Sequence, residues 1–188
     1  RGGRLSVERK GTVYFFTGLA GAGKTTIGGL FYARLKARSP ETVLLDGDQI
    51  RGAAGHSSPV TGAVLLEDRY TTAARKAGAW PLFQRCRDLA DQGKDVVCCS
   101  ISMYSDIRQW NRENIENYRE IYIKVTRETL YKRDQKKLYS SGAKNVVGVD
   151  LPYDEPGHSS IVIQNDGDET PESIVERLIR FFNLNEPV

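Results

Sequence analysis

The sequence is poor in the residues that build disulfide frameworks, metal clusters or membrane spans. Three cysteines occur among 188 residues, and two of them, Cys98 and Cys99, are adjacent in an apolar stretch. The cysteines have no metal-ligand spacing, so we expect reduced thiols in the core. No apolar run approaches the roughly 18–20 residues of a membrane-spanning helix, and the start shows no signal-peptide pattern. These absences favour a cytoplasmic protein with no membrane partner.

The chain also has only a small excess of one sign of charge, since the formal net charge is +3. Basic residues are spread along the chain, with a local excess between Lys124 and Lys144. A nucleic-acid partner predicts a continuous basic stripe, so scattered lysines favour small anionic ligands. Repeats and low-complexity segments are absent too. We expect a flexible N-terminal segment at residues 1–10 and a single domain, long enough for a substantial core, over residues 11–188.

What the chain does have is a complete phosphate-binding motif, G-x-x-x-x-G-K-T, which ends in Lys24 and Thr25. Residues 12–17 before it have the pattern of a buried strand, and residues 26–38 after it have helical apolar spacing. In this context Lys24 reaches the β- and γ-phosphates of a nucleotide and the Thr25 hydroxyl holds Mg²⁺. We expect the triphosphate contacts at Gly18, Leu19, Ala20, Gly21, Ala22, Gly23, Lys24, Thr25 and Thr26.

Strand and helix patterns alternate along the rest of the chain. This alternation predicts an α/β fold of the P-loop NTPase type: a three-layer parallel sheet with helices on both faces and a short lid. The further strands are expected at residues 42–46, 96–102, 120–125 and 160–164. The further helices are expected at residues 65–92 (broken before Pro81), 106–117, 128–137 and 171–182, the last with Thr170 and Pro171 at its start.

Two carboxylates follow the second strand, at Asp46 and Asp48, with Arg51 shortly after them. A carboxylate here can accept a hydroxyl proton or hold Mg²⁺, while the arginine pairs with an anionic acceptor. The third strand does not end on the acid typical of ATPases, and no Asn-Lys-x-Asp guanine-reading motif occurs. Asp46 is therefore the expected acidic group, and Thr25 and Asp46 are the expected metal ligands.

A basic segment, Lys132 to Lys137, precedes a loop rich in Gly, Ser and Lys. Small-molecule kinases cover the transferring phosphoryl group with a lid that carries arginine and lysine, which excludes water and spreads the developing charge. We therefore expect Arg133 to contact the nucleotide phosphates.

Together these segments resemble the adenylyl-sulfate (APS) kinase family over most of the chain. The matching pieces are Phe16–Thr25, Leu45–Arg51, Ser100–Ser102 with Arg108 and Arg112, Arg133–Asp134 with Lys136, Leu138 and Tyr139, and Gly148–Pro156. In that family ATP phosphorylates the ribose 3′-hydroxyl of a sulfated adenylate. The resemblance implies ATP and Mg²⁺ as cofactors, a small nucleotide as substrate and a homodimer.

The resemblance also implies roles for individual residues. Lys24, Asp46 and Arg133 are the expected catalytic residues, with Asp46 as general base. Ser102 stands where the family carries a serine once considered a phosphorylated intermediate, a role that direct in-line transfer does not need. The acceptor contacts that follow from the resemblance are Asp48, Arg51, Ile101, Ser102, Lys136 and Val146.

The departures from the family fall on the acceptor side. Gln49 and Met103 replace the family's Asn and Pro, and Val146 replaces an aromatic side chain that stacks on the substrate adenine. Between Arg51 and Gly93 the chain is about ten residues longer than the family pattern, which leaves two alignments. One makes Arg69 the substrate-phosphate arginine, with Val64 at the second stacking position and Thr72 in place of an Asn. The other makes Arg75 that arginine and Tyr70 the stacking residue.

Kept catalytic residues and changed acceptor residues suggest a kinase for another nucleotide. APS is the family default. Three segments, Val96–Cys99, Trp110–Arg112 and Lys144–Gly148, are also similar to APS-kinase-like chains of surface-polysaccharide pathways, one of which acts on cytidine diphosphoramidate. A non-catalytic nucleotide-binding module is the alternative of another class, and it has no use for an acceptor-side base or a lid arginine.

Overall fold

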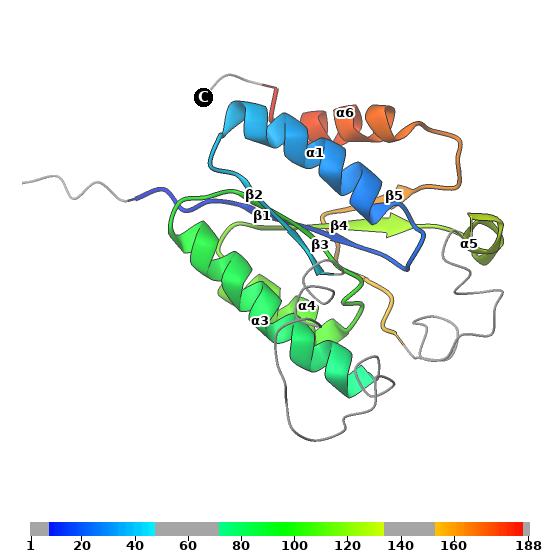
Figure 1. Ribbon diagram of the computed structural model, residues 1–188, viewed down its shortest axis with the longest axis horizontal. Coiled ribbons are helices and arrows are strands. Elements are labelled where there is room, and N and C mark those ends of the chain that lie inside the picture. Colours follow the sequence, from blue (N-terminus) through cyan, green and yellow to red (C-terminus); the bar gives the residue numbers. More distant parts are fainter. Residues whose placement is uncertain (1–7, 48–71, 134–152, 186–188) are drawn as a thin grey trace, which may run out of the picture.

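The computed structural model describes residues 8–47, 72–133 and 153–185, and it places their strands in one parallel sheet (Figure 1). The sheet has five strands in the order β2-β3-β1-β4-β5. They are β1 (Val13–Thr17), β2 (Val43–Asp46), β3 (Val96–Cys99), β4 (Tyr118–Lys124) and β5 (Ile161–Gln164). The helices are α1 (Lys24–Arg38), α3 (Thr72–Asp91), α4 (Ser105–Asn114), α5 (Arg127–Arg133) and α6 (Pro171–Phe181).

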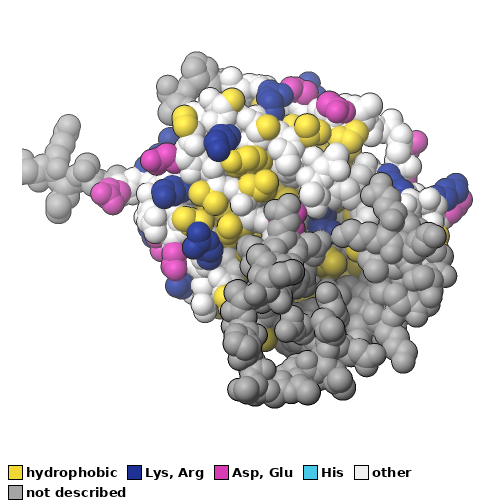
Figure 2. Space-filling view, viewed as in Figure 1, with side chains coloured by type: hydrophobic (Ala, Val, Ile, Leu, Met, Phe, Trp, Pro, Cys, Tyr) yellow, Lys and Arg dark blue, Asp and Glu magenta, His cyan; other side chains and the backbone are white. Residues whose placement is uncertain are grey.

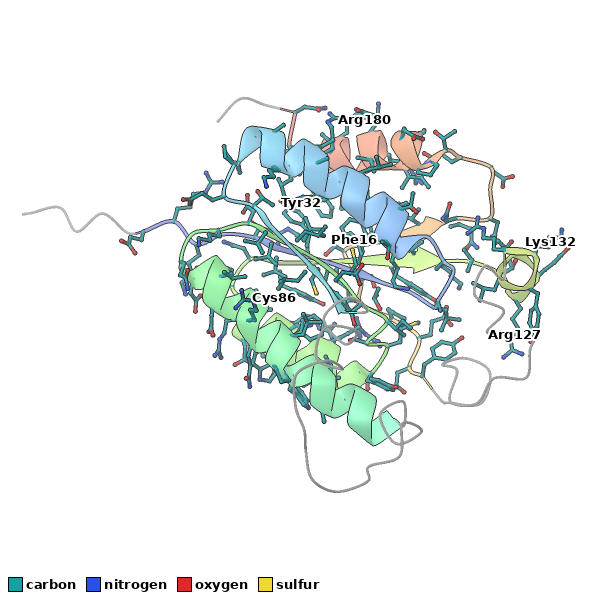
Figure 3. All side chains as sticks on the ribbon, viewed as in Figure 1. Phe16, Tyr32, Cys86, Arg127, Lys132 and Arg180 are labelled. Carbon is teal, nitrogen blue, oxygen red and sulfur yellow. The ribbon has the colours of Figure 1, made fainter. Side chains whose placement is uncertain are left out.

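Helices cover both faces of this sheet, α1 and α6 on one and α3 and α4 on the other (Figure 1). The predicted three-layer parallel α/β fold is confirmed. The central strand β1 is an unbroken run of buried residues because both of its faces are covered. Phe16 lies under α1 (Figure 3) and packs on Phe31, with ring centroids 5.4 Å apart. Phe15 points to the other face and meets Phe83 of α3 at 4.8 Å.

The cysteines lie within these layers. Cys86 faces the sheet from α3 (Figure 3), and Cys98 and Cys99 belong to β3. All three are buried and free of disulfide bonds, as the sequence predicts.

The predicted break before Pro81 is wrong, because α3 runs through that residue without interruption. Proline lacks the N–H for one helical hydrogen bond, but here its ring is on the exposed side of the helix. A helix tolerates a lost bond best on its solvent side, where it bends slightly. Buried Ala79, Leu82 and Phe83 hold both halves of α3 on the sheet.

Other boundaries differ by a few residues. β3 ends at Cys99 rather than residue 102, since the carbonyl of Ile101 accepts a hydrogen bond from the Thr17 side chain instead of continuing the ladder. The helix expected at residues 106–117 ends at Asn114, and β4 begins at Tyr118. Thr170 caps α6 as predicted, its side chain accepting from the N–H of Ser173 at 3.2 Å.

The described surface carries both signs of charge. In Figure 2, Lys and Arg side chains alternate with Asp and Glu around apolar atoms on the part of this face that the structure describes. None of the described helices is long and apolar enough to cross a membrane. The predicted short lid falls on residues 134–152, outside the described residues.

Candidate active site

Residues 18–23 connect the end of β1 to the start of α1 through a tight loop. Gly18 and Gly23 have φ angles of 156° and 104°, which L side chains rarely adopt. A Cβ at Gly18 would also lie 2.5 Å from the carbonyl oxygen of Ile123 on β4. Glycine at these two positions lets the backbone turn sharply enough for its N–H groups to converge on a phosphate.

Lys24 is the first residue of α1, and its side chain folds back over the loop. Its Nζ lies 3.0 Å from the carbonyl oxygen of Leu19, and the residue is 7% exposed. The loop itself is closed by a hydrogen bond of 3.1 Å from the Ala22 N–H to the same carbonyl. A cation and the positive end of a 15-residue helix therefore act at one place, which favours a polyanion.

Thr25 and Asp46 come together across the sheet edge, from the start of α1 and the end of β2. The Thr25 Oγ1 lies 3.4 Å from Asp46 Oδ2. Among the described residues no group of three or more His, Cys, Asp or Glu side chains is placed to hold a metal ion. Mg²⁺ does not need one, because it binds through one or two carboxylates, water and substrate phosphates. The hydroxyl and the carboxylate are hard oxygen ligands of the kind it prefers, so this pair fits Mg²⁺.

Arg133 ends α5 and reaches the same loop. Its Nη2 donates to the carbonyl of Asn165 at 2.6 Å, and its Nη1 lies 3.5 Å from the carbonyl of Gly21. The guanidinium therefore lies at the rim of the loop. Four residues that the sequence singles out for phosphate chemistry, Lys24, Thr25, Asp46 and Arg133, thus meet at the carboxyl edge of the sheet.

A cavity of about 710 Å³ opens beside this group. One wall is the loop with Arg133, and the other is the turn between β5 and α6. This volume suits a nucleotide-sized ligand. The cavity is lined by Ala20, Gly21, Gly23, Lys24, Thr25, Thr26, Ile27, Arg133, Asn165, Gly167, Asp168, Glu169, Thr170 and Pro171.

The residues of the second wall were not predicted from the sequence. Asn165 follows β5, is buried, and donates from Nδ2 to the carbonyl of Ala22 at 2.8 Å, which braces the loop from behind. The residues from Gly167 to Pro171 lead into α6 and face the loop across the cavity. The sequence did contain a signal for this wall. The strand at residues 160–164 was predicted, and in a parallel sheet the residues that follow each strand lie at the edge where ligands bind.

Residues 100–104 form the short irregular connection, or turn, that leads from β3 to α4. Ser102 has a φ of 26°, and its Oγ lies 2.7 Å from that of Ser100. Ile101 and Ser102 are both 8% exposed. The structure thus brings these two predicted acceptor residues close to the phosphate loop, because Ile101 belongs to a cluster against which Leu19 and Ala20 pack.

Charged groups beyond this turn shift one another's pKa values. Burial, and then the charge of Glu155, raise the pKa of the Tyr122 hydroxyl. Glu155 pairs with Lys124 at 2.8 Å, which lowers the pKa of this carboxyl and raises that of the lysine. Hydrogen bonds from the backbone of Ser105 lead the causes that lower the pKa of Asp154.

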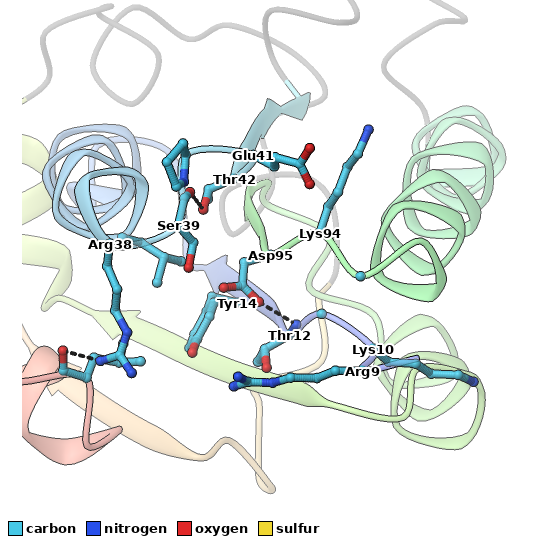
Figure 4. A pocket seen from close by; sticks show the side chains of 15 residues that line it. Arg9, Lys10, Thr12, Tyr14, Arg38, Ser39, Glu41, Thr42, Lys94 and Asp95 are labelled. Carbon is cyan, nitrogen blue, oxygen red and sulfur yellow. Dashed lines mark hydrogen bonds between the residues drawn. The ribbon is translucent and has the colours of Figure 1, made fainter. Parts of the chain in front are cut away.

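A second cavity, of about 270 Å³, lies at the other end of the sheet (Figure 4). Lys10, Arg38 and Lys94 are among its lining residues, together with Tyr14 and Asp95. Burial, and then the charge of Asp95, raise the pKa of Tyr14 to about 12. None of the site residues predicted from the sequence is among the residues that line this cavity, whereas Lys24, Thr25 and Arg133 line the larger one.

Comparison with known proteins agrees with this geometry. The sequence profile of the family described as adenylylsulphate kinase matches residues 10–164, most of the chain. The chain belongs to the adenylylsulphate kinase family. It is therefore an ATP-dependent phosphotransferase, and the resemblance seen in the sequence is confirmed.

Relatives within the adenylylsulphate kinase family include proteins with different names. A cytidine diphosphoramidate kinase of Campylobacter jejuni is 37% identical over 172 residues, covering 89% of this chain and 94% of that protein. An adenylyl-sulfate kinase of Picosynechococcus is 33% identical, covering 89% and 92%. The Mycobacterium tuberculosis APS kinase, solved with AMPPNP and APS, superposes with a TM-score of 0.74 at 22% identity, over 93% and 98% of the chains. That last likeness confirms the P-loop kinase fold.

Several residues that the sequence predicts to contact the acceptor lie outside the described residues. They are Asp48, Arg51, Arg69, Lys136 and Val146. Arg75 lies in the first turn of α3, and its side chain is also outside what the structure describes. The two alignments that assign the substrate arginine to Arg69 or Arg75 therefore both stay open.

Proposed function

We propose that this kinase transfers the γ-phosphoryl group of ATP to the ribose 3′-hydroxyl of a small anionic nucleotide. The observation that carries the proposal is the meeting of Lys24, Arg133 and the Thr25–Asp46 pair at one edge of the sheet. Phosphoryl transfer needs positioning and charge stabilisation more than covalent chemistry. Two cations on one side and a carboxylate on the other supply both.

Each residue has a role in this proposal. Lys24 and Arg133 bind the phosphates and stabilise the charge that develops on the transferred group. Thr25 and Asp46 would hold Mg²⁺, which when bound neutralises phosphate charge. The Asp46 carboxylate also accepts the proton that leaves the acceptor hydroxyl as the new O–P bond forms and the bond to ADP breaks. Ser102 helps to orient the acceptor and carries no phosphoryl group.

The acceptor we propose is a cytidine nucleotide, with cytidine diphosphoramidate as the first candidate and APS as the alternative. Two facts support this order. The Campylobacter relative of that name is 37% identical, against 33% for the Picosynechococcus adenylyl-sulfate kinase. In the sequence, Val146 replaces the aromatic side chain that the APS resemblance expects on the adenine. Loss of one stacking contact costs about 1–3 kcal/mol, or roughly tenfold to a hundredfold in binding.

A coupled ADP-release screen across adenylates and cytidylates tests this, with the product's mass and the phosphorylated position read directly. We expect kcat/KM for cytidine diphosphoramidate to exceed that for APS. A higher kcat/KM for APS would reverse the choice of acceptor. If no nucleotide raises ADP release above background hydrolysis, the chain is a nucleotide-binding module instead.

The role of Asp46 is tested by Asp46→Asn, which keeps the size of the side chain and removes the base. We expect kcat to fall by about a hundredfold or more, the usual contribution of general-base catalysis. Asp95→Asn is a matched control, because Asp95 accepts a hydrogen bond from the Thr12 N–H at the other end of the sheet. Turnover of Asp46→Asn at the wild-type rate would remove Asp46 as the base.

The homodimer that the family resemblance implies is part of the same proposal. Light scattering at several concentrations measures it, and a monomer at all of them would contradict it.

A further inference from the structure

The turn of residues 100–104 touches several parts of the nucleotide site at once. Its apolar side chains Ile101 and Met103 form a small cluster with Tyr122, and Leu19 and Ala20 of the phosphate loop pack against it. On its other side Ser100 lies against the end of β2: a Cβ added to Gly47 would be 2.9 Å from the Ser100 Oγ. The position of this turn therefore sets the distance between its side chains, the phosphate loop and Asp46.

The turn is not in a relaxed conformation. Ser102 is not glycine, yet its φ is 26°, and it is only 8% exposed. A residue in this region of backbone space persists only where the surrounding contacts over-determine it. The hydrogen bond between the Ser102 and Ser100 hydroxyls lies within the turn, so the restraint must also come from outside it.

Two outside contacts supply that restraint. On one side the buried Thr17 Oγ1 donates to the Ile101 carbonyl at 2.7 Å. On the other side the Asp154 N–H donates to the Met103 carbonyl at 2.8 Å. The Asp154 Oδ2 also accepts from the N–H and the Oγ of Ser105, at 3.0 and 3.2 Å.

The side chain of Asp154 also caps the N-terminus of α4. Tyr104, at the N-cap position of α4, makes no side-chain capping bond of its own. A carboxylate at this position satisfies an unpaired helical N–H and interacts favourably with the positive helix end. Asp154 therefore caps α4 from about fifty residues away and, through its own N–H, ties the cap to the turn.

We infer that Thr17 and Asp154 are positioning residues for the acceptor, which hold Ile101 and Ser102 in place relative to Lys24 and Asp46. Thr17 directly precedes Gly18, so one strand end fixes both the phosphate loop and the acceptor turn. Neither residue needs to touch substrate. This inference rests on the proposed function, because Ile101 and Ser102 orient an acceptor only if the chain is a nucleotide kinase.

Matched variants separate positioning from general stability. Thr17→Val removes the hydroxyl and keeps the shape. Thr42→Val is its control, because the buried Thr42 Oγ1 makes the same kind of bond, to the Ser39 carbonyl at 2.6 Å, at the other end of the sheet. Asp154→Ala keeps the backbone N–H that donates to the Met103 carbonyl and removes the carboxylate that fixes residue 154 on Ser105. Asp154→Asn restores an oxygen acceptor there. Asp106→Ala removes a carboxylate from the same first turn of α4, one that accepts from Lys76 and from the Ile107 N–H rather than from Ser105.

The measurements are KM for ATP, KM for the acceptor and the melting temperature, with cytidine diphosphoramidate and APS as acceptor probes. We expect Thr17→Val, which loses one hydrogen bond, to raise the acceptor KM by about threefold to tenfold, and Asp154→Ala, which loses the two bonds from Ser105, to raise it by at least as much. The KM for ATP should stay within about twofold, the scatter expected for uncoupled sites. Asp154→Asn should recover most of the loss, and the two controls should leave the acceptor KM unchanged. An equal rise in both KM values, or the same rise in Asp106→Ala, would overturn the inference.

Amide hydrogen exchange of residues 100–105 tests the same inference without turnover. We expect exchange there to quicken about tenfold in Thr17→Val and Asp154→Ala, and not in the controls. If the wild type phosphorylates neither probe, the proposed function fails, and the exchange result alone decides whether the two residues hold the turn. Unchanged exchange in both variants would refute that.

Discussion

Lys24 shows how one side chain can be prepared for a charged ligand before the ligand arrives. The residue is almost fully buried, and the carbonyl of Leu19 gives its ammonium a partner at 3.0 Å. A long flexible side chain that is already ordered loses less entropy when it binds phosphate. The hydrogen bond to the Leu19 carbonyl thus offsets part of the free-energy cost of burying the charge.

We predict that Lys24→Ala lowers kcat by about a hundredfold or more, because a preorganised cation on the developing charge is lost. ADP release measures the effect, and circular dichroism checks that the fold survives. Lys36→Ala on the same helix is the control, since Lys36 is exposed and its Nζ contacts the Tyr32 side chain in the last turns of α1. Equal losses in both variants would show that helix stability, and not the charge on the phosphates, accounts for the result.

At the scale of elements, the first turns of α1, just after the phosphate loop, pack directly against the sheet. A Cβ at Gly28 would lie 2.3 Å from the Sγ of Cys99 on β3. The Cys99 Sγ is itself 3.6 Å from the Lys24 carbonyl. A small residue on the helix and a thiol on the strand therefore set the depth of α1, and with it the height of the loop.

Gly28→Ala should destabilise the fold by about 1–3 kcal/mol through overpacking, even though alanine is the better helix former. Gly29→Ala is the matched control: nothing lies within 4 Å of its added Cβ, so it should gain about 0.5–1 kcal/mol. Urea unfolding measures both. Adding Cys99→Ala to Gly28→Ala should return part of the loss, and strict additivity of the two substitutions would contradict the contact.

The helix that carries Arg133 is anchored at its other end. Asp166, after β5, accepts hydrogen bonds from the N–H and Oγ1 of Thr126 at 2.9 and 3.1 Å. Thr126 in turn caps α5 through the N–H of Thr129 at 3.2 Å. The backbone hydrogen bond from Thr126, followed by that from the Thr129 side chain, leads the causes that lower the pKa of Asp166.

This anchor predicts a pH-dependent stability. Because the pKa of Asp166 is lower in the folded state, its carboxylate stabilises the fold above the unfolded pKa of about 3.9. That stabilisation is lost as the pH falls below this value toward the folded pKa. Asp166→Asn should therefore melt below the wild type at pH 7, and the gap should shrink on acidification. A gap that is the same at about pH 3 would exclude the carboxylate as its cause.

At the scale of the whole molecule, one sheet edge gathers segments that are far apart in the chain. The loop after β1, the end of β2, the turn after β3 and the turn after β5 all meet there, as expected for parallel strands. A ligand that bridges them links the two layers of helices. Binding should therefore stabilise the entire fold and not only the loop.

We expect an ATP analogue with Mg²⁺ at a hundred times its Kd to stabilise the protein by about 2.7 kcal/mol. For a chain of this length that corresponds to a rise in Tm of roughly 5–10 °C. Thermal unfolding with and without EDTA measures it. The chelator should remove most of the shift, and Lys24→Ala should show less of it; a shift in the wild type that EDTA leaves intact would argue against the Thr25–Asp46 metal site.

The sequence by itself determined the layer order, the phosphate loop and the family, because these depend on local patterns. Glycines at fixed spacing, an apolar strand before them and an amphipathic helix after them can be read without knowing the fold. Residues 52–92 contain no such local pattern to fix their alignment with the family. The sequence therefore leaves Arg69 and Arg75 as alternatives for the substrate-phosphate arginine.

Only the tertiary structure decided what braces the site. Asn165 behind the loop, Asp154 on α4 and the depth that Cys99 sets for α1 each join residues separated by many tens of positions. It also kept α3 continuous through Pro81, where the local preference for a break is outweighed by packing on the sheet. Local rules describe how a segment prefers to fold, whereas contacts between distant segments depend on where the whole chain has already placed them.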